Sequence, residues 1–308
     1  MSPFLIMEYI SVNQYLQDTF GRKIYKIALD GGFTCPNRDG TCGSRGCIFC
    51  SGEGSGDFAS DRHLSITEQI EQGKSRVEHK LNAADSSKPQ YLAYFQAYTN
   101  TYAPTDRLEA LYMEAINHPD VVAISIATRP DCLPDDVIAL LAKMNAIKPV
   151  WVELGLQTVH EATARYIRRG YSLDVYDDAV CRLMSAGIPQ IITHVILGLP
   201  LENKAMMLET VRHVAESGSN GIKLQLLHVI KGTDLEEEYR RGVFDVMSME
   251  EYTDIVVECL QELPSDMVIH RMTGDGARRS LVAPMWSTDK KRVLNTLVRK
   301  IKEADRRN

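Results

Sequence analysis

Short apolar runs alternate with amphipathic stretches along most of this chain. The runs are nearly continuous in apolar residues, which is typical of strands buried on both faces of a parallel sheet. The stretches between them repeat apolar residues at helical spacing. The predicted strands are Ile24–Leu29, Tyr91–Gln96, Val121–Ala127, Val150–Leu156, Ile191–Leu197 and Ile222–Val229. The predicted helices are Ile66–Leu81, Arg107–Asn117, Pro134–Asn145, Val175–Ala186, Lys204–Ser217 and Met249–Leu263.

This succession of strand–helix units indicates an α/β fold. A (β/α) barrel, either eightfold or an open six-stranded version, fits the pattern, and so does a doubly wound open sheet. Periodicity does not separate the two architectures. Both place functional residues at the carboxyl ends of the strands. Polar residues and glycines do collect at those ends here, for example in Gln96–Tyr102 and Gly198–Pro200.

Composition places the chain among ordinary globular proteins, with 44% hydrophobic and 25% charged residues. No run approaches the roughly 18 unbroken apolar residues of a membrane span, so we expect no membrane association. The N-terminal sequence does not resemble a signal peptide. The seven cysteines are an odd number and do not suggest a disulfide framework. A reducing, cytoplasmic location fits them better.

The charge is distributed unevenly along the chain. The net charge of −6 by itself argues against binding to nucleic acid. Residues 288–308, however, hold eight Lys or Arg against three acids, which leaves +5 there and −11 on the rest. This segment is predicted to form an amphipathic helix whose apolar stripe is Val293, Leu294, Leu297, Val298 and Ile301. Its basic face is either simply solvated or attracted to RNA phosphates.

Four cysteines lie close together, at Cys35, Cys42, Cys47 and Cys50, within turn-forming sequence. Thiolates are soft ligands that select zinc, copper(I) or iron–sulfur clusters. Only the last two cysteines form the close pair typical of zinc sites, and no histidine lies between the four. An iron–sulfur cluster on three cysteines would leave one iron open to a further ligand. Zinc, an iron–sulfur cluster and simple burial of the thiols all remain open on spacing alone.

A longer motif surrounds these cysteines: Ala28-Leu-Asp-Gly-Gly-Phe-Thr-Cys35-Pro-Asn-Arg-Asp-Gly-Thr, then Gly46-Cys-Ile-Phe-Cys50. This motif closely resembles that of the radical S-adenosylmethionine (SAM) enzymes of the YhcC/YtqA group, relatives of the elongator catalytic subunit. The resemblance covers nearly the whole chain. It continues through Thr128–Asp131, Glu153–Thr158, His194–Pro200, Leu227–Thr233 and His270–Asp275.

The resemblance implies a partial (β/α)6 radical SAM barrel with a C-terminal extension. Residues 1–23 would be an N-terminal extension, residues 24–265 the barrel, and residues 266–308 the C-terminal extension with its basic helix. The resemblance also implies a [4Fe–4S] cluster on Cys35, Cys47 and Cys50, with SAM chelated to the open iron. Cys42 departs from the family pattern and is expected to be a spectator or a substitute ligand.

Further site residues follow from the family pattern and from polar positions at strand ends. Phe49 would pack near the adenine of SAM, or else anchor the loop. Gln96, Tyr98 and Asn100 follow the second strand, where the family binds the SAM amino group, although turn hydrogen bonding explains any one of them equally well. The expected contacts to the ribose or methionine of SAM are Glu153 and Gln157. His228 is expected to contact the adenine or the substrate.

Four residues are candidates on the substrate side. Arg129 either contacts substrate or forms a local ion pair with Asp131. His194 lies within a strand, where a histidine is more often a hydrogen-bonded core residue. Arg271 and Asp275 belong to a polar segment expected to form an added strand and loop beside the barrel mouth.

The expected function is a radical SAM reaction on tRNA, because the elongator-like branch modifies wobble uridines. Members similar to YtqA look like enzymes that process a carboxymethylaminomethyl group on that uridine towards an aminomethyl form. An electron donor such as flavodoxin or ferredoxin would be a second partner. Radical chemistry on a small metabolite is one alternative. A non-catalytic iron–sulfur or zinc protein that senses redox state or binds a partner is another.

Overall fold

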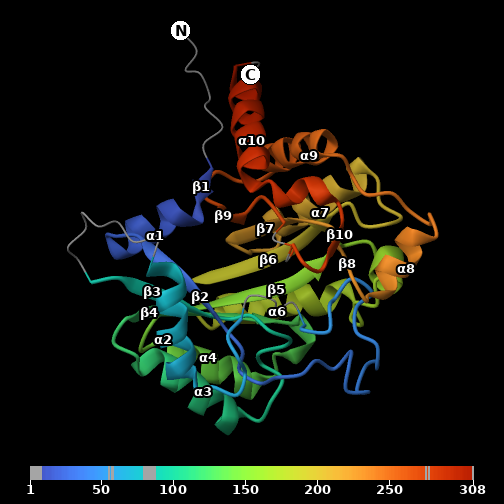
Figure 1. Cartoon of the computed structure of the whole chain (residues 1–308). Coiled ribbons are helices and arrows are strands. Elements are labelled where there is room, and N and C mark those ends of the chain that lie inside the picture. The colour runs from blue at the N-terminus through green and yellow to red at the C-terminus, as the bar shows by residue number, and fades with distance from the viewer. Residues whose placement is uncertain are drawn as a thin grey trace.

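All six predicted strands are present, and they lie side by side in chain order within one parallel sheet. The computed structural model describes residues 9–54, 56, 59–78, 88–274, 276 and 278–306. A doubly wound sheet would reverse its strand order part-way, whereas this sheet runs in one direction and curls into a half-barrel (Figure 1). The partial barrel is therefore confirmed. Its strands are β2 (Ile24–Leu29), β3 (Gln90–Phe95), β4 (Val121–Thr128), β5 (Val150–Gln157), β6 (Gln190–Leu197) and β7 (Gly221–Leu226).

Two short strands extend the sheet beyond β7. These are β9 (Val268–Arg271), which pairs with β7, and β1 (Ile10–Ser11), which pairs with β9; both pairings are parallel. Segments expected as extensions at the two ends of the chain thus contribute to the sheet. The last predicted strand ends at Leu226, earlier than expected, and its final residue, Val229, belongs instead to β8 (Val229–Ile230), which pairs with β10 (Leu281–Ala283) in a separate antiparallel ribbon.

Helices cover the outer face of the sheet (Figure 1). All six predicted helices are present, although α2 ends at Val77 and residues 79–87 lie outside the described residues. Serine side chains cap two of them, since Ser65 and Ser248 each form a reciprocal capping box with a glutamate three residues later. The helices are α1 (Val12–Phe20), α2 (Ile66–Val77), α3 (Thr105–Asn117), α4 (Asp135–Asn145), α5 (Glu161–Tyr166), α6 (Leu173–Ser185), α7 (Lys204–Glu216), α8 (Asp234–Arg240), α9 (Met249–Glu262) and α10 (Lys290–Asp305). No helix in these described ranges is long and apolar enough to span a membrane.

The inner face of the half-barrel is closed at its amino end by an apolar plug. Trp151 is the largest member; its cluster includes Leu92 from β3, Ile192 from β6 and Leu16 from α1. The Tyr15 ring meets the Trp151 ring edge-on, with centroids 5.7 Å apart. The plug seals one end of the barrel, so that the open space inside lies towards the carboxyl ends of the strands.

Helix α10 packs on α9 through only part of its predicted apolar stripe. Val293, Leu297 and Ile301 are buried, whereas Leu294 and Val298 are each nearly half exposed. A helix that rests on a single neighbour buries a narrow seam, so the wider stripe expected from the sequence is covered only along one side. Lys300 also lies in this seam and bonds Asp254 at 2.5 Å.

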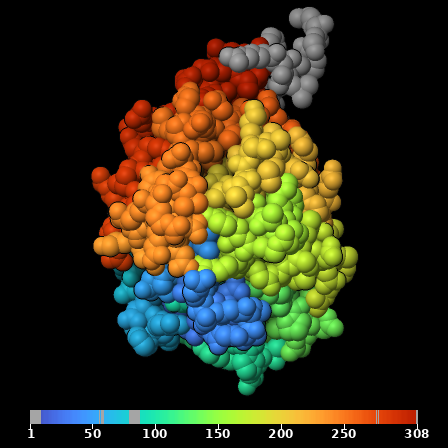
Figure 2. Space-filling view, turned by 90° about the vertical axis from the view of Figure 1, so that its right-hand side faces the viewer, coloured from blue at the N-terminus to red at the C-terminus, as the bar shows by residue number. Residues whose placement is uncertain are grey.

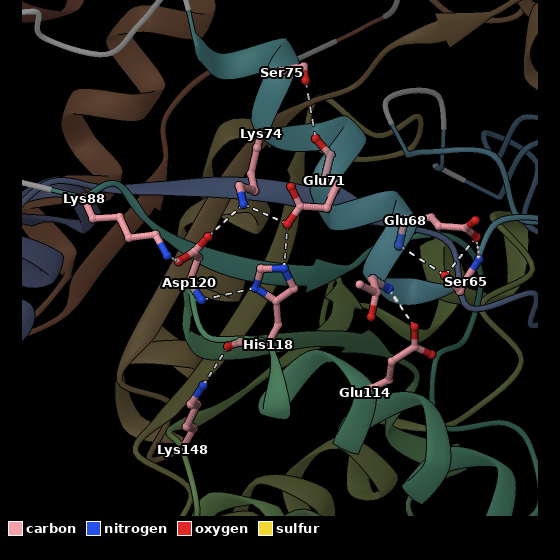
Figure 3. A network of polar contacts seen from close by, with 11 residues as sticks. Ser65, Glu68, Glu71, Lys74, Ser75, Lys88, Glu114, His118, Asp120 and Lys148 are labelled. Carbon is pink, nitrogen blue, oxygen red and sulfur yellow. Dashed lines mark hydrogen bonds and ion pairs between the residues drawn. The ribbon is translucent and has the colours of Figure 1, made fainter.

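A polar network ties α2 to the amino ends of β3 and β4 (Figure 3). The buried carboxylate of Asp120 accepts hydrogen bonds from Lys74 at 2.7 Å and pairs with Lys88 at 2.5 Å. Lys74 also bonds Glu71 at 2.8 Å, and His118 bonds the same carboxylate at 2.9 Å. The carboxylates of Glu71 and Asp120 and the imidazole of His118 approach one another within 4.8 Å, as metal ligands would. The Lys74 ammonium, however, bridges the two carboxylates. Lysine therefore neutralises the carboxylates of this network, which links α2 to the two strands.

Candidate active site

A cavity of about 560 Å³ opens at the carboxyl ends of the barrel strands. Figure 2 faces these ends and shows a hollow bounded by the blue cysteine loop and by the green-yellow and orange segments that follow the later strands. Cys35, Cys47 and Cys50 line this cavity. Cys42 is exposed and lines a different depression, together with Tyr102. The structure thus brings together the three cysteines expected as ligands and separates the fourth from them.

Side chains from within the loop fix its shape. The amide of Asn37 donates to the backbone oxygen of Arg168 at 2.7 Å and to the sulfur of Cys47 at 3.5 Å. Arg38 donates to the backbone oxygens of Cys50, at 3.0 Å, and Ser51, at 2.6 Å. The Asn37 bond holds the cysteine loop against the segment that follows α5, and the Arg38 bonds close the loop on itself, so the thiols keep their place without a regular element of their own.

The three thiols suit a multinuclear cluster better than a single metal ion. Burial, and then the neighbouring Cys50, raise the pKa of the Cys47 thiol to about 12, so deprotonation requires a cationic partner such as a metal. A tetrahedral zinc ion with bonds of about 2.3 Å would hold its sulfurs about 3.8 Å apart. In the described residues, Glu71, His118 and Asp120 are the only three potential ligands that lie within 4.8 Å of one another. At least one pair of the three cysteine sulfurs is therefore more than 4.8 Å apart, farther than one zinc ion holds two of its ligands.

Predicted SAM contacts line the same cavity. Phe49, Gln96, Tyr98, Gln157 and His228 all border it. The amide oxygen of Gln157 is buried, and no hydrogen-bond partner for it is found within the described part of the chain. Tyr98 and Gln157 both have positive φ, 61° and 67°, a conformation that non-glycine residues rarely adopt and that concentrates at functional sites. The rim backbone is therefore strained at Tyr98 and Gln157, and the amide oxygen of Gln157 is available to accept a hydrogen bond from a ligand.

Below the rim, the carboxylate of Glu153 lies fully buried inside the barrel. Ser125 donates to it at 2.8 Å, His194 bonds it at 2.8 Å, and the Lys26 ammonium lies 3.3 Å away. Lys223, itself almost completely buried, contacts the same carboxylate. The sequence pattern suggested that Glu153 lies at the end of its strand. Strand β5 continues to Gln157, however, so Glu153 lies in the middle of the strand.

The charges in this interior network depend on one another. Burial alone would raise the pKa of Glu153, but the charges of Lys223 and Lys26 bring it well below its usual value. Burial lowers the pKa of Lys223 to about 7, against the opposing effect of Glu153. Burial and the charge of Lys223 lower the pKa of His194 to about 4, so this imidazole is neutral at pH 7 and donates to the carboxylate.

Comparison with known proteins identifies the family. Residues 40–214 match the radical SAM superfamily, and residues 219–303 match the radical SAM C-terminal domain. The first match alone covers more than half of the chain.

The chain belongs to the radical SAM superfamily.

Protein YtqA of Bacillus subtilis (strain 168) is 45% identical to this radical SAM enzyme over 94% of the chain and 88% of its own length. A tRNA uridine(34) acetyltransferase of Methanocaldococcus jannaschii is 26% identical over 50% of this chain and 28% of the relative. Among solved structures, the archaeal Methanocaldococcus infernus Elp3 with an N-terminal deletion superposes with a TM-score of 0.66 and 17% identity. That superposition covers 90% of this chain and 63% of the other, and it supports the fold alone.

The remaining predicted site residues of this radical SAM enzyme differ in where they lie. Asn100 does not line the cavity; its amide donates to the backbone oxygen of Ala127 at 2.8 Å, inside the protein. Arg129 lines the cavity, but its guanidinium is engaged with Asp131 at 2.9 and 2.7 Å, the local ion pair weighed from the sequence. Arg271 lines the cavity on the β9 side, and Asp275 lies outside the described residues.

The sequence pattern missed much of the interior network of this radical SAM enzyme. Lys26, Tyr94, Ser125 and Lys223 were not singled out, although each interrupts an otherwise apolar strand. The alternation of inward-facing and outward-facing positions along each strand could have identified them, because every second residue of a barrel strand points inward. Trp151, Glu153 and Gln157 of β5 share one such face, which leads from the apolar plug to the cavity.

Replacing Lys223 with Met should lower the free energy of unfolding by about 3 kcal/mol, because Glu153 keeps its buried charge and loses its most buried partner. Urea unfolding followed by circular dichroism measures this loss. The matched control is Lys204→Met, which removes an exposed lysine paired with Glu258 and should cost less than about 1 kcal/mol. Equal stability of the two variants would contradict a central role for the Glu153–Lys223 pair.

Proposed function

We propose that this radical SAM enzyme holds a [4Fe–4S] cluster on Cys35, Cys47 and Cys50 and binds SAM at the open iron, to modify a uridine side chain of tRNA. The observation that carries the proposal is that three thiols line one cavity with unsatisfied and strained polar residues at its rim. When bound, the reduced cluster and SAM supply a 5′-deoxyadenosyl radical that removes a hydrogen atom from the substrate. A donor such as flavodoxin or ferredoxin supplies the electron.

The protein's own residues would position the cofactor and exclude water. Phe49 lies between two of the ligands and offers an aromatic face for the adenine. Gln157, with its unsatisfied buried oxygen, is suited to a hydroxyl or amino donor of SAM. The Tyr98 hydroxyl donates to the backbone oxygen of Gly52 at 2.6 Å and so holds down the loop beyond the last ligand. A site enclosed in this way protects a radical from solvent.

The tRNA substrate is supported by kinship rather than by a dedicated RNA-binding domain. A relative that matches 50% of this chain at 26% identity is named for its action on uridine 34 of tRNA. The likeness to the YhcC/YtqA group narrows the proposed reaction to a carboxymethylaminomethyl group on the wobble uridine, which the enzyme would process towards aminomethyl. Residues Lys291, Arg292 and Arg299 border a shallow depression along α10 and offer cations to the tRNA backbone.

The nucleosides of tRNA test this proposal directly. Cells that lack this protein should accumulate carboxymethylaminomethyluridine at the expense of its aminomethyl form, because the proposed reaction links the two. Liquid chromatography with mass spectrometry measures both. Complementation with the wild-type chain should restore the profile, whereas the Cys47→Ala variant should not. Identical profiles with and without the protein would rule out this substrate.

Ligand identity is tested by single substitutions of the four cysteines. Anaerobically reconstituted wild-type protein should hold about four irons per chain, and Ala at position 35, 47 or 50 should abolish reductive SAM cleavage. The matched control is Cys42→Ala, which should keep both iron and cleavage because Cys42 faces a different depression. Iron analysis and quantification of 5′-deoxyadenosine provide the readouts. Loss of the cluster in Cys42→Ala alone would show that the ligand assignment is wrong.

The basic helix α10 is tested through the salt dependence of tRNA binding. Neutralising Lys290, Lys291 and Arg292 with Gln should flatten the slope of log affinity against log salt by about one for every phosphate that the helix no longer neutralises. SAM cleavage without tRNA should persist, because α10 contributes no residue to the cavity. Gel-shift titrations at several salt concentrations measure the slope.

A control with the same change in net charge separates direct phosphate binding from long-range attraction. Neutralising Lys143, Lys204 and Arg212, which are exposed on α4 and α7, should leave the slope near that of wild type. If the α10 variant behaved like this control, α10 would not belong to the tRNA interface.

A further inference from the structure

The cavity contains more positive than negative side chains. Glu153 is the only carboxylate among the described residues that line it. Two of the lining arginines form ion pairs with acids that do not line the cavity: Arg129 pairs with Asp131, and Arg169 pairs with Glu161. The basic residues that line the cavity are Lys26, Arg38, Arg129, Arg169, Lys223 and Arg271. A site with this balance favours an anionic ligand.

At the inner end of the cavity, two lysine side chains share one carboxylate. Lys26 and Lys223 both pair with Glu153. Both also lie over the ring of Tyr94, with 4.4 and 4.8 Å between each nitrogen and the ring centroid. One carboxylate does not fully compensate Lys26 and Lys223 when both are charged, so a second anion placed here would be stabilised by both and would favour the ammonium form of Lys223, whose pKa burial lowers to about 7.

Lys26 is the cation of this pair that a ligand can reach. It belongs to β2, an edge strand of the half-barrel, and about a third of its side chain is exposed, whereas Lys223 is almost completely buried. Glu153 would retain Lys223, His194 and Ser125 if Lys26 turned towards an incoming group. The lysine stem is flexible, so this movement requires no change in the strand.

Depth distinguishes this position from the cofactor position. Lys26 precedes the end of β2 at Leu29 by three residues, which places it roughly 10 Å below the rim along the strand. The cysteine loop begins after that end. The proposed function holds the chelating groups of SAM at the cluster, on the rim. A cationic position deeper in the barrel is therefore available to the substrate.

We propose that Lys26, with Lys223 behind it, forms a subsite for a carboxylate carried by the substrate. The inference rests on the proposed function for the identity of that substrate. A carboxymethylaminomethyl side chain ends in a carboxylate, whereas the aminomethyl product ends in an ammonium group. The same two lysines would thus attract the substrate and repel the product, which makes the subsite a determinant of specificity and of product release.

Binding of two tRNAs that differ only in this group tests the subsite. The reconstituted holoenzyme, with SAM and without reductant, is titrated with tRNA carrying either carboxymethylaminomethyluridine or aminomethyluridine. Wild-type protein should prefer the first by about tenfold to a hundredfold, the range of a hydrogen bond between charged groups. Lys26→Gln should abolish the preference, Lys26→Arg should retain it, and SAM affinity should be unchanged in both variants.

The matched control is Lys23→Gln, which removes an exposed lysine that lies over Tyr25 outside the cavity. It should keep the full preference. Thermal unfolding of every variant shows that loss of preference does not reflect loss of the fold, and Lys26→Arg keeps the test decisive if the Gln variant is unstable. An equal affinity of wild-type protein for the two tRNAs would overturn the subsite. So would a preference that survives Lys26→Gln, or a parallel loss of SAM affinity.

A second probe separates failure of the subsite from failure of the tRNA proposal. Free 5-carboxymethylaminomethyluracil and 5-aminomethyluracil are compared on the same proteins. If neither tRNA binds but the carboxylate base is preferred in a Lys26-dependent way, the tRNA proposal fails and the carboxylate subsite stands. If neither tRNA binds and neither base is preferred, the subsite is overturned as well.

Discussion

The buried negative charge of Glu153 is the constraint on which the barrel interior depends. An isolated carboxylate in an apolar interior is strongly destabilising, so partners must reach it from neighbouring strands. Each of the six central strands places one polar residue at this level: Lys26, Tyr94, Ser125, Glu153, His194 and Lys223. A one-residue slip of any strand would move its polar side chain to the outer, apolar face. The network therefore specifies strand register in addition to charge balance.

The same network divides the inside of the half-barrel into two parts with different chemistry. Below it, Trp151 and its neighbours form a dry plug that α1 closes. Above it, the cavity runs to the rim, where Cys35, Cys47 and Cys50 lie on a loop held by its own hydrogen bonds. Membership of the radical SAM superfamily explains why thiols and strained polar residues meet at that rim. The surplus of cations deeper in the cavity is the basis of the carboxylate subsite that we propose.

Much of this arrangement was predictable because it is local in sequence. The apolar runs predicted all six central strands, and the motif around the cysteines indicated which three would lie together. The Glu153 network was not predictable in the same way, since its contacts join residues such as Lys26 and Glu153 that are 127 positions apart. Strand β1 was missed because two residues carry too little periodicity and form a strand only by pairing with an existing edge, whereas β9 overlaps the added strand expected around Arg271. The sequence left two roles open for Asn100, and the structure shows its amide bonded to the backbone behind the rim, with Asn100 outside the residues that line the cavity.

In the reaction that we propose, a hydrogen atom passes from a uridine side chain of tRNA to the radical derived from SAM. The most direct measurement uses reconstituted, reduced protein with SAM and tRNA whose carboxymethylaminomethyl group is deuterated at its methylene carbons. Mass spectrometry of the 5′-deoxyadenosine formed follows the transfer. We expect one deuterium per molecule of 5′-deoxyadenosine, and none when unlabelled tRNA is used. Unlabelled 5′-deoxyadenosine formed from the deuterated tRNA would contradict the claim.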